Sequence, residues 1–539
     1  MSFGRTRVTS RVTYHYHWVK WRGQPRETAP QDVDKLRKTM SERIANAALQ
    51  GKVMSAEEAA QFIDNGATVG MSGFTGAGYP KALPTAIAER AKKEHAAGNE
   101  YKINVLTGAS TAPDCDGVLA EADAINYRAP YQSDPSMRKA INSASMKYQD
   151  IHLSHMGMLV QQNFIDVDVA VIEAVRITEE GNVIPSSAVG NNVEYMDAAD
   201  KIIIEVNEWQ SLELEGMHDI WEMPKLPNRV PIPITKPGDR IGTPYIEVDP
   251  EKIVAIVKTD EADRNAPFKP ADEISEKIAG NFLDFLEGEV AAGRLSYDGY
   301  IMQSGVGNVP NAVMAGLLDS KFNNIQAYTE VIQDGMVDLI DSGKMTVASA
   351  TSFSLSPEYA HKMNEEASNY REHIILRPQQ ISNHPEVIRR VGLIATNGMI
   401  ESDIYGNINS TNVSGSRMMN GIGGSGDFTR NAYISSFISP SEAKDGKIST
   451  IVPFASHIDH TEHDAMVVIT EYGYADLRGL APRDRVAKMI AIAHPDYRAQ
   501  LEEYYERALK GKNLHTPHDL GTAFSFHINL AENGTMRLN

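Results

Sequence analysis

The segment YTEVIQDG, residues 328–335, carries one carboxylate, Glu330, at the end of an apolar run and directly before a turn. Such a carboxylate is either a solvated loop charge or a group that does chemistry, since carboxylates can act as nucleophiles in covalent catalysis. The chain holds 71 acidic residues, so the solvated interpretation is favoured for any one of them taken alone. Only the elements around Glu330 can change that interpretation.

Two glycine-rich segments could form loops whose backbone approaches a ligand closely. They are SGVGN, residues 304–308, and GIGGSG, residues 421–426. The second formally matches G-x-G-x-x-G, but a dinucleotide-binding loop follows a strand and precedes an acid by about 20 residues. Here SGSRMMN precedes the glycines and Asp427 follows at once. We therefore predict no nicotinamide cofactor.

The segment HIDHTEHD suggests metal binding, because its imidazoles and carboxylates are common metal ligands. These side chains are His457, Asp459, His460, His463 and Asp464. Their spacing matches no zinc pattern that we can defend, and histidines in a polar loop are more often solvated or hydrogen bonded. We predict no metal.

The only cysteine, Cys115, lies between Asp114 and Asp116. Neighbouring negative charge disfavours a thiolate, so we interpret Cys115 as a structural residue and not as a nucleophile. A single cysteine also excludes an intrachain disulfide framework and is typical of a reducing compartment.

The composition is that of a globular protein, with 539 residues, 42% of them hydrophobic, and a formal net charge of -19. This length favours two large domains. The negative charge argues against a nucleic-acid partner, which needs a basic surface, but allows a local Lys or Arg site for an anionic ligand. No apolar run approaches the roughly 18 to 20 residues that span a bilayer, so we expect no membrane association.

The N-terminus differs from the rest, because residues 1–26 contain six Lys or Arg residues and no acid. This balance resembles a mitochondrial transit peptide. We favour a disordered extension over residues 1–39, since a helical pattern begins at Met40. The expected location is cytoplasmic, or mitochondrial if the basic segment is a genuine transit peptide.

Several segments recur in the second half of the chain in the same order. ATVGMSGFTGAGYPKALPTAIAERAKK reads as a strand, a glycine-rich loop and a helix beginning near Pro80, and GYIMQSGVGNVPNAVMAGLLD repeats this pattern from Gly299. YKINVLTGAS pairs with NIQAYTEVIQDG, and VDVAVIEAVRITEEGNVIPSS pairs with VGLIATNGMIESDIYGNINST. We also pair KIIIEVNEW, from Lys201, with AMVVITEYGYADL, from Ala465.

These repeats predict two similar open α/β domains in tandem, with mostly parallel sheets. We assign residues 40–223 to the first domain and 251–539 to the second. Residues 224–250 contain seven prolines and predict an extended connector. Ligand sites in such sheets lie beyond the carboxyl ends of the strands, where we expect residues 304–309, Glu330 and the loop after Ile400.

Five ordered motifs together resemble the class I coenzyme A transferases, specifically the acetyl-CoA hydrolase/transferase family. They are SGFTGAGYPK, QSGVGNVPNAV, YTEVIQDGM, NGMIESDIYGNINST and MMNGIGGSGDFTRNA. The resemblance extends from about Met40 to the C-terminal region. It implies an active site between the two α/β domains and an enzyme that moves coenzyme A between carboxylic acids. The implied substrates are acyl-CoA and short carboxylates, with succinyl-CoA and acetate as the expected pair, and no permanently bound cofactor.

The resemblance identifies Glu330 as the nucleophile. It attacks the thioester to give a mixed anhydride, and the released CoA thiolate then converts this anhydride to a glutamyl-CoA thioester. Each step develops an oxyanion, and the resemblance implies that the amides of Val306 and Gly424 stabilise it. For either loop alone, a simple tight turn is an equally good interpretation.

Other residues follow from the resemblance less directly. Asn383 would hold the carboxylate of Glu330 or of a substrate, and Glu471 would orient Asn383 or shape the acid pocket. Arg264 would pair with an anionic part of the ligand, and Lys444 with a CoA phosphate. For these two cations, ordinary surface salt bridges are an equally good interpretation. The implied CoA-binding set is Gly305, Val306, Gly307, Asn308, Asn420, Gly424, Lys444 and Arg264.

Two alternatives remain open. An acetyl-CoA hydrolase would differ only in whether water reaches the Glu330 intermediate, and a non-catalytic acyl-CoA sensor would not need a nucleophile. Gly108 stands opposite Glu330 when Thr107 and Thr329 are aligned, so we expect one active site per chain. A homodimer is the expected assembly.

Overall fold

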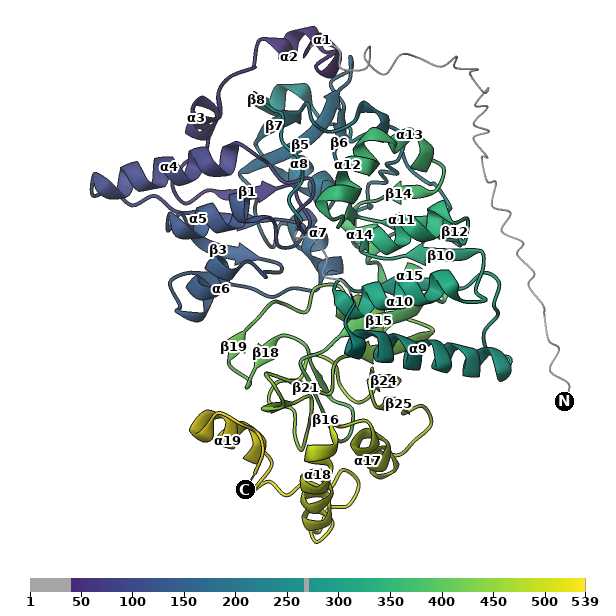
Figure 1. The fold of residues 1–539 in the computed structure, drawn as a ribbon. Helices are drawn as coiled ribbons and strands as arrows, with labels where there is room; N and C mark the ends of the chain where they lie inside the picture. The colour runs from purple at the N-terminus through teal and green to yellow at the C-terminus, as the bar shows by residue number, and fades with distance from the viewer. Residues whose placement is uncertain (1–39, 266–270, 539) are drawn as a thin grey trace, which may run out of the picture. The chain divides into compact units, whose positions relative to one another are not determined.

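The computed structural model describes residues 40–265 and 271–538. The chain divides into two compact units, 1–39 and 40–539. The basic extension predicted over residues 1–39 lies outside the described residues. The unit 40–539 contains two α/β lobes, each built on a mostly parallel eight-stranded sheet (Figure 1).

The first lobe has the strand order β4-β3-β2-β1-β5-β7-β8, with β6 antiparallel to β5. The strands are β1 (Thr68–Met71), β2 (Ile103–Leu106), β3 (Ile125–Ala129), β4 (Lys147–Tyr148), β5 (Val169–Ile177), β6 (Val183–Pro185), β7 (Lys201–Asn207) and β8 (Ile253–Thr259). The helices are α1 (Met40–Arg43), α2 (Ala47–Gln50), α3 (Ala56–Ala59), α4 (Leu83–Ala96), α5 (Val118–Glu121), α6 (Pro135–Asn142), α7 (Leu153–Gln161) and α8 (Asn192–Ala198). The long apolar runs of β5 and β7 are almost continuously buried, as expected for strands covered on both faces.

The second lobe has the strand order β14-β12-β10-β9-β15-β20-β24-β25. Its strands are β9 (Ile301–Ser304), β10 (Ile325–Tyr328), β12 (Met345–Ala350), β14 (Ile374–Leu376), β15 (Ile394–Gly398), β20 (Ile434–Ile438), β24 (Val467–Thr470) and β25 (Gly473–Asp476). Its helices are α9 (Glu273–Ala291), α10 (Asn308–Asp319), α11 (Asp334–Asp341), α12 (Pro357–Glu365), α13 (Ala367–Tyr370), α14 (Gln379–Ser382), α15 (Pro385–Val391), α16 (Ser425–Thr429), α17 (Pro482–Ala491), α18 (Pro495–Ala508) and α19 (Ser525–Asn533).

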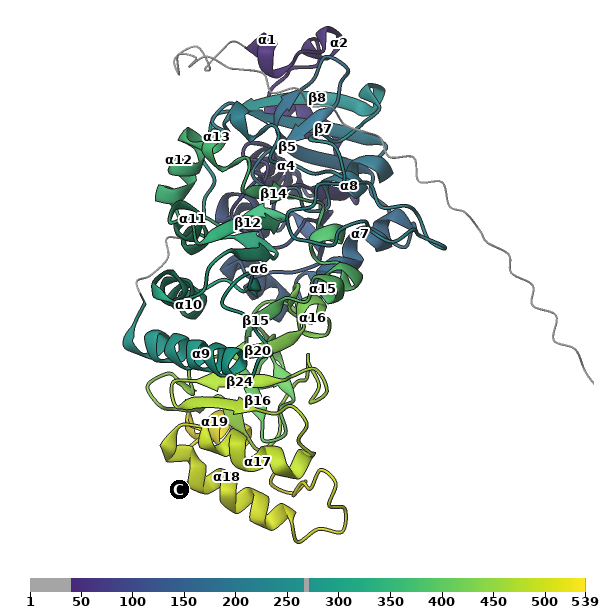
Figure 2. The same ribbon diagram turned by 90° about the vertical axis from the view of Figure 1, so that its right-hand side faces the viewer.

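The second lobe also contains several short strands outside its main sheet. They are β11 (Val331–Ile332) with β13 (Ser352–Phe353), β16 (Glu401–Asp403) with β17 (Ile408–Asn409) and β23 (Ile451–Val452), β18 (Asn412–Val413) with β19 (Arg417–Met418), and β21 (Glu442–Ala443) with β22 (Ile448–Ser449). In the view of Figure 2, helices α17 and α18 lie beyond β24 and β16, at the end of the lobe farthest from the first sheet.

Most of the predicted repeat corresponds to equivalent strands of the two sheets. β1 and β9 occupy the same central place, β2 and β10 lie beside them on one side, and β5 and β15 on the other. The predicted match between the segment from Lys201 and the segment from Ala465 was wrong. The first segment forms β7, which lies beside β5, and the equivalent strand of the second sheet is β20, which lies beside β15. The counterpart of β24 is therefore β8. Both runs are apolar and buried, so composition alone did not distinguish neighbouring strands.

The segment from Ile253 also differs from its predicted place. We expected it to open the second domain, but β8 pairs with β7 in parallel and forms the edge of the first sheet. The change of sheet therefore comes after Thr259. Residues 224–249 contain neither helix nor named strand, as expected for a connector, yet Ile232 and Ile234 are buried in a small core with Tyr328, Ile381 and other residues of the second lobe.

The helical pattern from Met40 forms three short helices instead of one. Between these helices the chain is extended and forms two isolated β-bridges, one between Ile44 and Ile177 and one between Val53 and Ile256. Ser55 then starts α3 with a complete capping box to Glu58.

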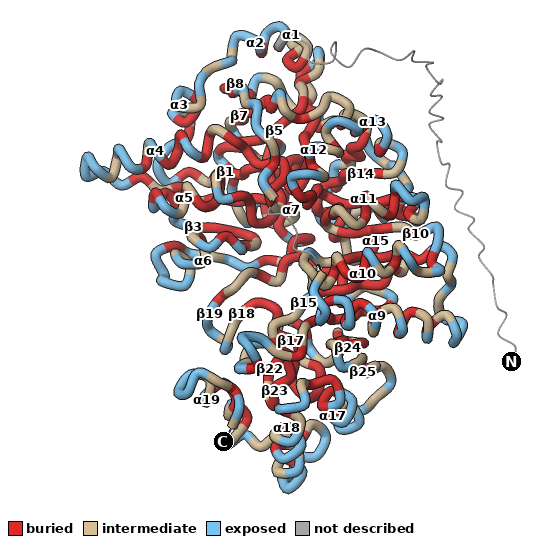
Figure 3. The backbone as a smooth tube through the Cα atoms, in the orientation of Figure 1, coloured by how far each residue is buried: buried red, intermediate tan, exposed pale blue. Residues whose placement is uncertain are grey.

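The core is concentrated in the two sheets, and the buried stretches of the chain follow their strands (Figure 3). The lobes are joined by backbone hydrogen bonds, from Val189 N to Thr351 O (2.9 Å) and from Phe353 N to Ser187 O (3.0 Å). Ser187 and Val189 follow β6, and Thr351 and Phe353 follow β12. Among the described residues, no helix is long and apolar enough to cross a membrane.

Candidate active site

Strand order reverses between β9 and β15 in the second sheet, so a crevice is expected beyond the carboxyl ends of the strands there. Ser304 is the last residue of β9, and Glu330 follows the end of the adjacent β10 by two residues. The predicted location of both at strand ends is confirmed. Glu330 lies in a bend between β10 and β11, and its backbone oxygen accepts a hydrogen bond from Thr351 N (3.0 Å).

Asn383, the residue that ends α14, holds the Glu330 side chain. Its Nδ2 donates a hydrogen bond to Glu330 Oε2 (3.1 Å). Its Oδ1 accepts a hydrogen bond from the Ser382 hydroxyl (2.8 Å), so the amide is oriented from its other end. The contact expected between Asn383 and Glu330 is therefore present.

Gly424 completes this group from the loop before α16. A Cβ built on Gly424 would lie 1.6 Å from Glu330 Oε2 and 2.4 Å from Asn383 Nδ2. These separations are far below van der Waals contact, so no other residue fits without displacing the carboxylate. The backbone of Gly424 consequently lies directly against the Glu330 side chain.

The surroundings of Glu330 oppose its ionisation. Burial raises the pKa of Glu330 to about 7, the Asn383 hydrogen bond acts in the opposite direction, and the charge of Asp427 adds to the rise. Desolvation is the largest of these effects. A carboxylate in this place is consequently much more basic than a solvated one.

Asp427, which the sequence did not identify as functional, lies in α16 close to this group. Its carboxylate accepts hydrogen bonds from Ser154 N (3.0 Å) and Ser154 Oγ (2.6 Å) at the start of α7. The two residues are 273 positions apart, so no local spacing could indicate their contact. The acid that follows the GIGGSG loop is therefore explained by its contact with Ser154 of the first lobe.

The loop 420–424 rests on the first lobe at several further points. Asp150 accepts a hydrogen bond from Ile422 N (2.9 Å), the Tyr148 hydroxyl donates to Asn420 O (3.3 Å), and Leu153 N donates to Gly423 O (3.3 Å). The group around Glu330 is therefore assembled from both lobes.

The SGVGN loop lies at the end of β9, next to β10. Gly305 O accepts a hydrogen bond from Gln333 Nε2 (2.9 Å), and Gly307 has φ 141°, a conformation that favours glycine, directly before α10. Asn308 is the first residue of that helix. Val306 is 52% exposed, and within the described residues no hydrogen bond joins it to Glu330.

Glu471 is placed differently from the expectation that it orients Asn383. It follows the end of β24, and its carboxylate accepts hydrogen bonds from the Ser441 amide (2.9 Å) and hydroxyl. These two bonds tie the loop after β20 to the β24–β25 turn. Asn383 is oriented by Ser382 instead.

The two predicted cations differ in their surroundings. Lys444 is exposed at the turn between β21 and β22, and no carboxylate in the described part of the chain pairs with it. Arg264 is paired with Asp114 (3.4 Å) and Glu261 (3.2 Å), and its amide donates to Gly76 O (2.9 Å). In this structure Arg264 therefore forms ordinary salt bridges, the second of its two interpretations.

The side chains of HIDHTEHD have polar partners of other kinds. His460 is buried and contacts the Ser425 hydroxyl (3.1 Å), and Asp459 accepts hydrogen bonds from Ser410 and Thr411. No group of three or more His, Cys, Asp or Glu residues in the described ranges is arranged to hold a metal ion. Cys115 is buried, and burial and Asp116 raise its pKa.

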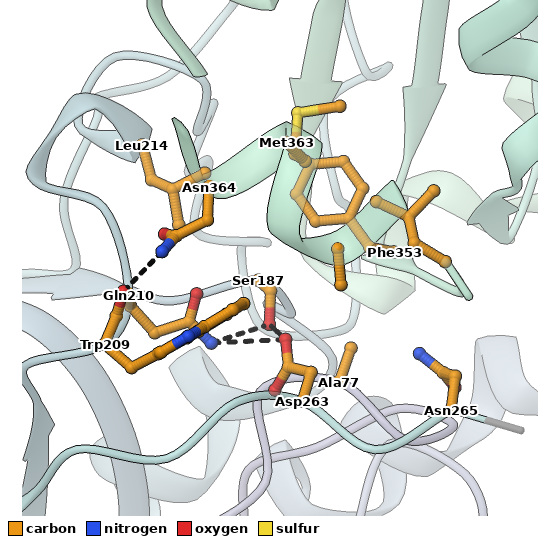
Figure 4. Close-up of a pocket in the computed structure, with 12 residues that line it drawn as sticks. Ala77, Ser187, Trp209, Gln210, Leu214, Asp263, Asn265, Phe353, Met363 and Asn364 are labelled. Carbon is orange, nitrogen blue, oxygen red and sulfur yellow. Dashed lines mark hydrogen bonds between the residues drawn. The ribbon is translucent and has the colours of Figure 1, made fainter. Parts of the chain in front are cut away.

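A separate small pocket lies between the lobes and does not include Glu330 (Figure 4). Trp209, Phe353 and Met363 are among its apolar lining residues, and Asp263 accepts hydrogen bonds there from Ser187 and Gln210. Its volume of about 20 Å³ is room for little more than one water molecule. This pocket is too small for a substrate of the size of an acyl-CoA.

Two family models match the chain. Residues 37–258 match the acetyl-CoA hydrolase/transferase N-terminal domain, and residues 360–505 match the C-terminal domain. The chain is 50% identical to a succinyl-CoA:acetate CoA-transferase from Clostridium kluyveri, over 92% of each protein. It is 46% identical to a propanoyl-CoA:succinate CoA transferase from Escherichia coli and 43% identical to an acetyl-CoA hydrolase from Schizosaccharomyces pombe. These matches cover 90% and 93% of this chain and 98% and 99% of those proteins.

Solved structures share the fold at lower identity. RipA from Yersinia pestis superimposes with a TM-score of 0.66 at 22% identity, over 86% of this chain and 98% of that one. A 4-hydroxybutyrate CoA-transferase from Porphyromonas gingivalis superimposes with a TM-score of 0.59, also at 22% identity, over 85% and 98% of the two chains.

Proposed function

The chain belongs to the acetyl-CoA hydrolase/transferase family, and from this premise we propose that it is an acyl-CoA:carboxylate CoA-transferase with Glu330 as its nucleophile. The relative from Clostridium kluyveri supports succinyl-CoA and acetate as the substrate pair. The observation that carries the proposal is the basic, desolvated Glu330 carboxylate, held by Asn383 against the Gly424 backbone.

The proposed reaction begins when a Glu330 oxygen attacks the thioester carbonyl of succinyl-CoA. The carbon–sulfur bond breaks, CoA leaves as a thiolate, and a succinyl-glutamyl anhydride remains. The thiolate then attacks the glutamyl carbonyl, succinate leaves, and a glutamyl-CoA thioester forms. Each step exchanges one acyl bond for another of similar reactivity, as covalent catalysis requires for a reversible transfer.

Acetate reverses the sequence. It attacks the glutamyl thioester to give an acetyl-glutamyl anhydride and CoA thiolate, and the thiolate takes the acetyl group and frees Glu330. Protons are neither gained nor lost overall. In both tetrahedral stages a backbone amide beside Glu330 can receive the oxyanion, and we assign this role to Gly424 and Val306.

The CoA moiety would extend from Glu330 along residues 305–308 and past Asn420 and Gly424. Lys444, which lacks a described carboxylate partner, is suited to meet a phosphate of CoA. Arg264 could do so only by exchanging its present contacts with Asp114 and Glu261. Coenzyme A enters as a substrate in this proposal, and the assembly that we expect is a homodimer.

Acetyl-CoA hydrolysis is the second candidate, because relatives such as the Schizosaccharomyces pombe protein are named acetyl-CoA hydrolases. It needs only water in place of the acceptor acid. An assay with succinyl-CoA and acetate, propionate or buffer alone separates the two. We expect acetyl-CoA with acetate and little free CoA in buffer, and we expect Glu330→Gln to form neither. Free CoA at the same rate in all three reactions would favour the hydrolase.

A further inference from the structure

Asp427 is a buried acid that the proposed reaction does not use. It is 4% exposed and lies on α16, three residues after Gly424. Three features of its surroundings connect it with Glu330: a hydrogen-bonded partner on the other lobe, a shared neighbour in Asn383, and its own charge.

The first feature fixes Asp427 across the lobes. Ser154 donates to it twice, through its amide and its hydroxyl (3.0 and 2.6 Å). The amide belongs to the first turn of α7, where the helix dipole also favours a negative charge. Because Asp427 and Gly424 lie on the same turn of chain, this attachment also fixes the position of Gly424 against Glu330.

The second feature is Asn383. Its side chain donates to Glu330 Oε2 (3.1 Å), and its amide dipole also acts to lower the pKa of Asp427. Burial is the largest effect on Asp427 and raises its pKa to about 7, while Ser154 and Arg430 act against burial. The carboxyl groups of Glu330 and Asp427 thus both lie near the side-chain amide of Asn383.

We propose that Asp427 is a positioning residue for the transfer reaction: its two hydrogen bonds with Ser154 hold the Gly424 loop against Glu330 and place a second acid beside the nucleophile. This inference rests on the proposed function, since it assigns a role relative to the nucleophile. Two like charges so close do not both form readily, and their protons leave in two coupled steps.

Other titratable groups also face the pair. His152 Nδ1 lies 4.0 Å from Asp427 Oδ1, but burial and Arg430 lower the pKa of His152 to about 4, so it is neutral near pH 7. Tyr131 lies on the Glu330 side, and burial and the charge of Glu330 raise its pKa to about 12. Asp427 is therefore the titrating group that can influence Glu330 near neutral pH.

The test is the pH dependence of kcat/KM for the purified full chain with succinyl-CoA and acetate. Asp427→Asn keeps the size of the side chain but removes its charge, so Glu330 should ionise more readily. We expect the acidic limb to move to lower pH by about one unit and kcat to fall about tenfold, because the Gly424 loop loses its charged attachment to Ser154.

Asp150→Asn is the matched control. Asp150 anchors the same loop through Ile422 N, but its charge is not among the causes of the Glu330 shift. The Asp150→Asn substitution should lower kcat without moving the acidic limb of the kcat/KM profile. If Asp427→Asn does not fold, Ser154→Ala tests the same point. Loss of the hydroxyl lets Asp427 keep its proton to higher pH, so the limb should again move down, by less.

An unmoved acidic limb in both Asp427→Asn and Ser154→Ala would overturn the inference, whatever happens to kcat. Borohydride trapping on the wild-type chain separates this failure from failure of the proposed function. A trapped Glu330 with an unmoved limb contradicts only the role of Asp427. An untrapped Glu330 contradicts the nucleophile itself.

Discussion

At the scale of single residues, the proposed chemistry depends on one carboxylate kept largely from water. Burial raises the pKa of Glu330 to about 7, so its ionised form is a stronger base than a solvated glutamate. A single amide, from Asn383, opposes this effect. The proposed nucleophile is consequently both available near neutral pH and reactive when it ionises.

This balance predicts how the rate responds to pH. In the proposed reaction the ionised Glu330 attacks, so kcat/KM should rise with pH around a midpoint near 7. Asn383→Ala removes the donor that stabilises the charged form, so the midpoint should move to higher pH and kcat should fall. Initial rates between pH 5 and 9 for both proteins provide the check. A wild-type midpoint near 4.5, the ordinary value for glutamate, would contradict the burial argument.

Gly424 predicts a steric effect at the same site. In Gly424→Ala the new methyl group would meet Glu330 Oε2 and Asn383 Nδ2, so the carboxylate must leave its place. We expect kcat to fall about 100-fold, as misplacement of a reacting group by about 1 Å can cause, with little change in melting temperature. Gly280→Ala, where nothing lies within 4 Å of the added Cβ, is the control and should remain active.

At the scale of elements, the connector between the lobes is attached to the second sheet by a buried arginine. Arg377, directly after β14, is fully buried and pairs with Asp219. Its guanidinium also donates to Ser349 Oγ (2.7 Å) and to the backbone oxygens of Pro237 (3.2 Å) and Asp239. One side chain therefore attaches the connector to the second sheet.

Arg377→Met should accordingly destabilise the fold. It removes the ion-pair partner of the buried Asp219, which keeps only its backbone donors Ile241 N and Gly242 N and the nearby Arg240, and breaking a buried pair costs roughly 3–5 kcal/mol. Urea or thermal unfolding of the full chain checks this value. Lys92→Met removes an exposed partner of Glu89 and should change stability by less than about 1 kcal/mol. Equal effects of the two substitutions would show that burial of the Arg377 pair is unimportant.

The element scale also shows how far the sequence could predict the structure. Repeated strand–loop–helix patterns located β9, β10 and β15, and with them Glu330, because local periodicity and turn residues determine such elements. The partner of a strand is determined by packing over long separations. For that reason β8 was assigned to the wrong sheet and β7 was matched with β24.

The same limit applies to the site. Glu330, Asn383 and Gly424 were predicted from motifs and lie together. Asp427 was missed because its partner Ser154 belongs to the other lobe. For Glu471 the motif left two roles open, orienting Asn383 or shaping the acid pocket, because a motif carries no information about which hydrogen bond a side chain makes; its observed partner is Ser441.

At the scale of the whole molecule, the net charge of -19 repels an anionic substrate. A CoA phosphate must therefore meet local positive charge, and Lys444 is exposed without a described carboxylate partner. The two lobes have equivalent central strands, but only the second has an acid after its second strand. A Cβ on the equivalent Gly108 would lie 2.8 Å from Gly73 O, so the first lobe has no room for a side chain there.

Lys444→Ala should raise the KM for succinyl-CoA about tenfold, the equivalent of one lost charge-assisted hydrogen bond, and should leave kcat nearly unchanged. A succinyl-pantetheine thioester lacks the nucleotide phosphates, so with this substrate the variant and the wild type should have similar KM values. Steady-state kinetics with both thioesters checks the role. A KM increase that persists with the truncated thioester would contradict phosphate binding.

The most direct measurement of the central claim is the covalent state of Glu330 during turnover. The full chain is mixed with succinyl-CoA, reduced with borohydride and digested, and the peptide that contains residues 328–335 is sequenced by mass spectrometry. The account predicts reduction of Glu330 to the alcohol, which is prevented when acetate is supplied in excess before borohydride. An unmodified Glu330, together with full transferase activity in Glu330→Ala, would contradict it.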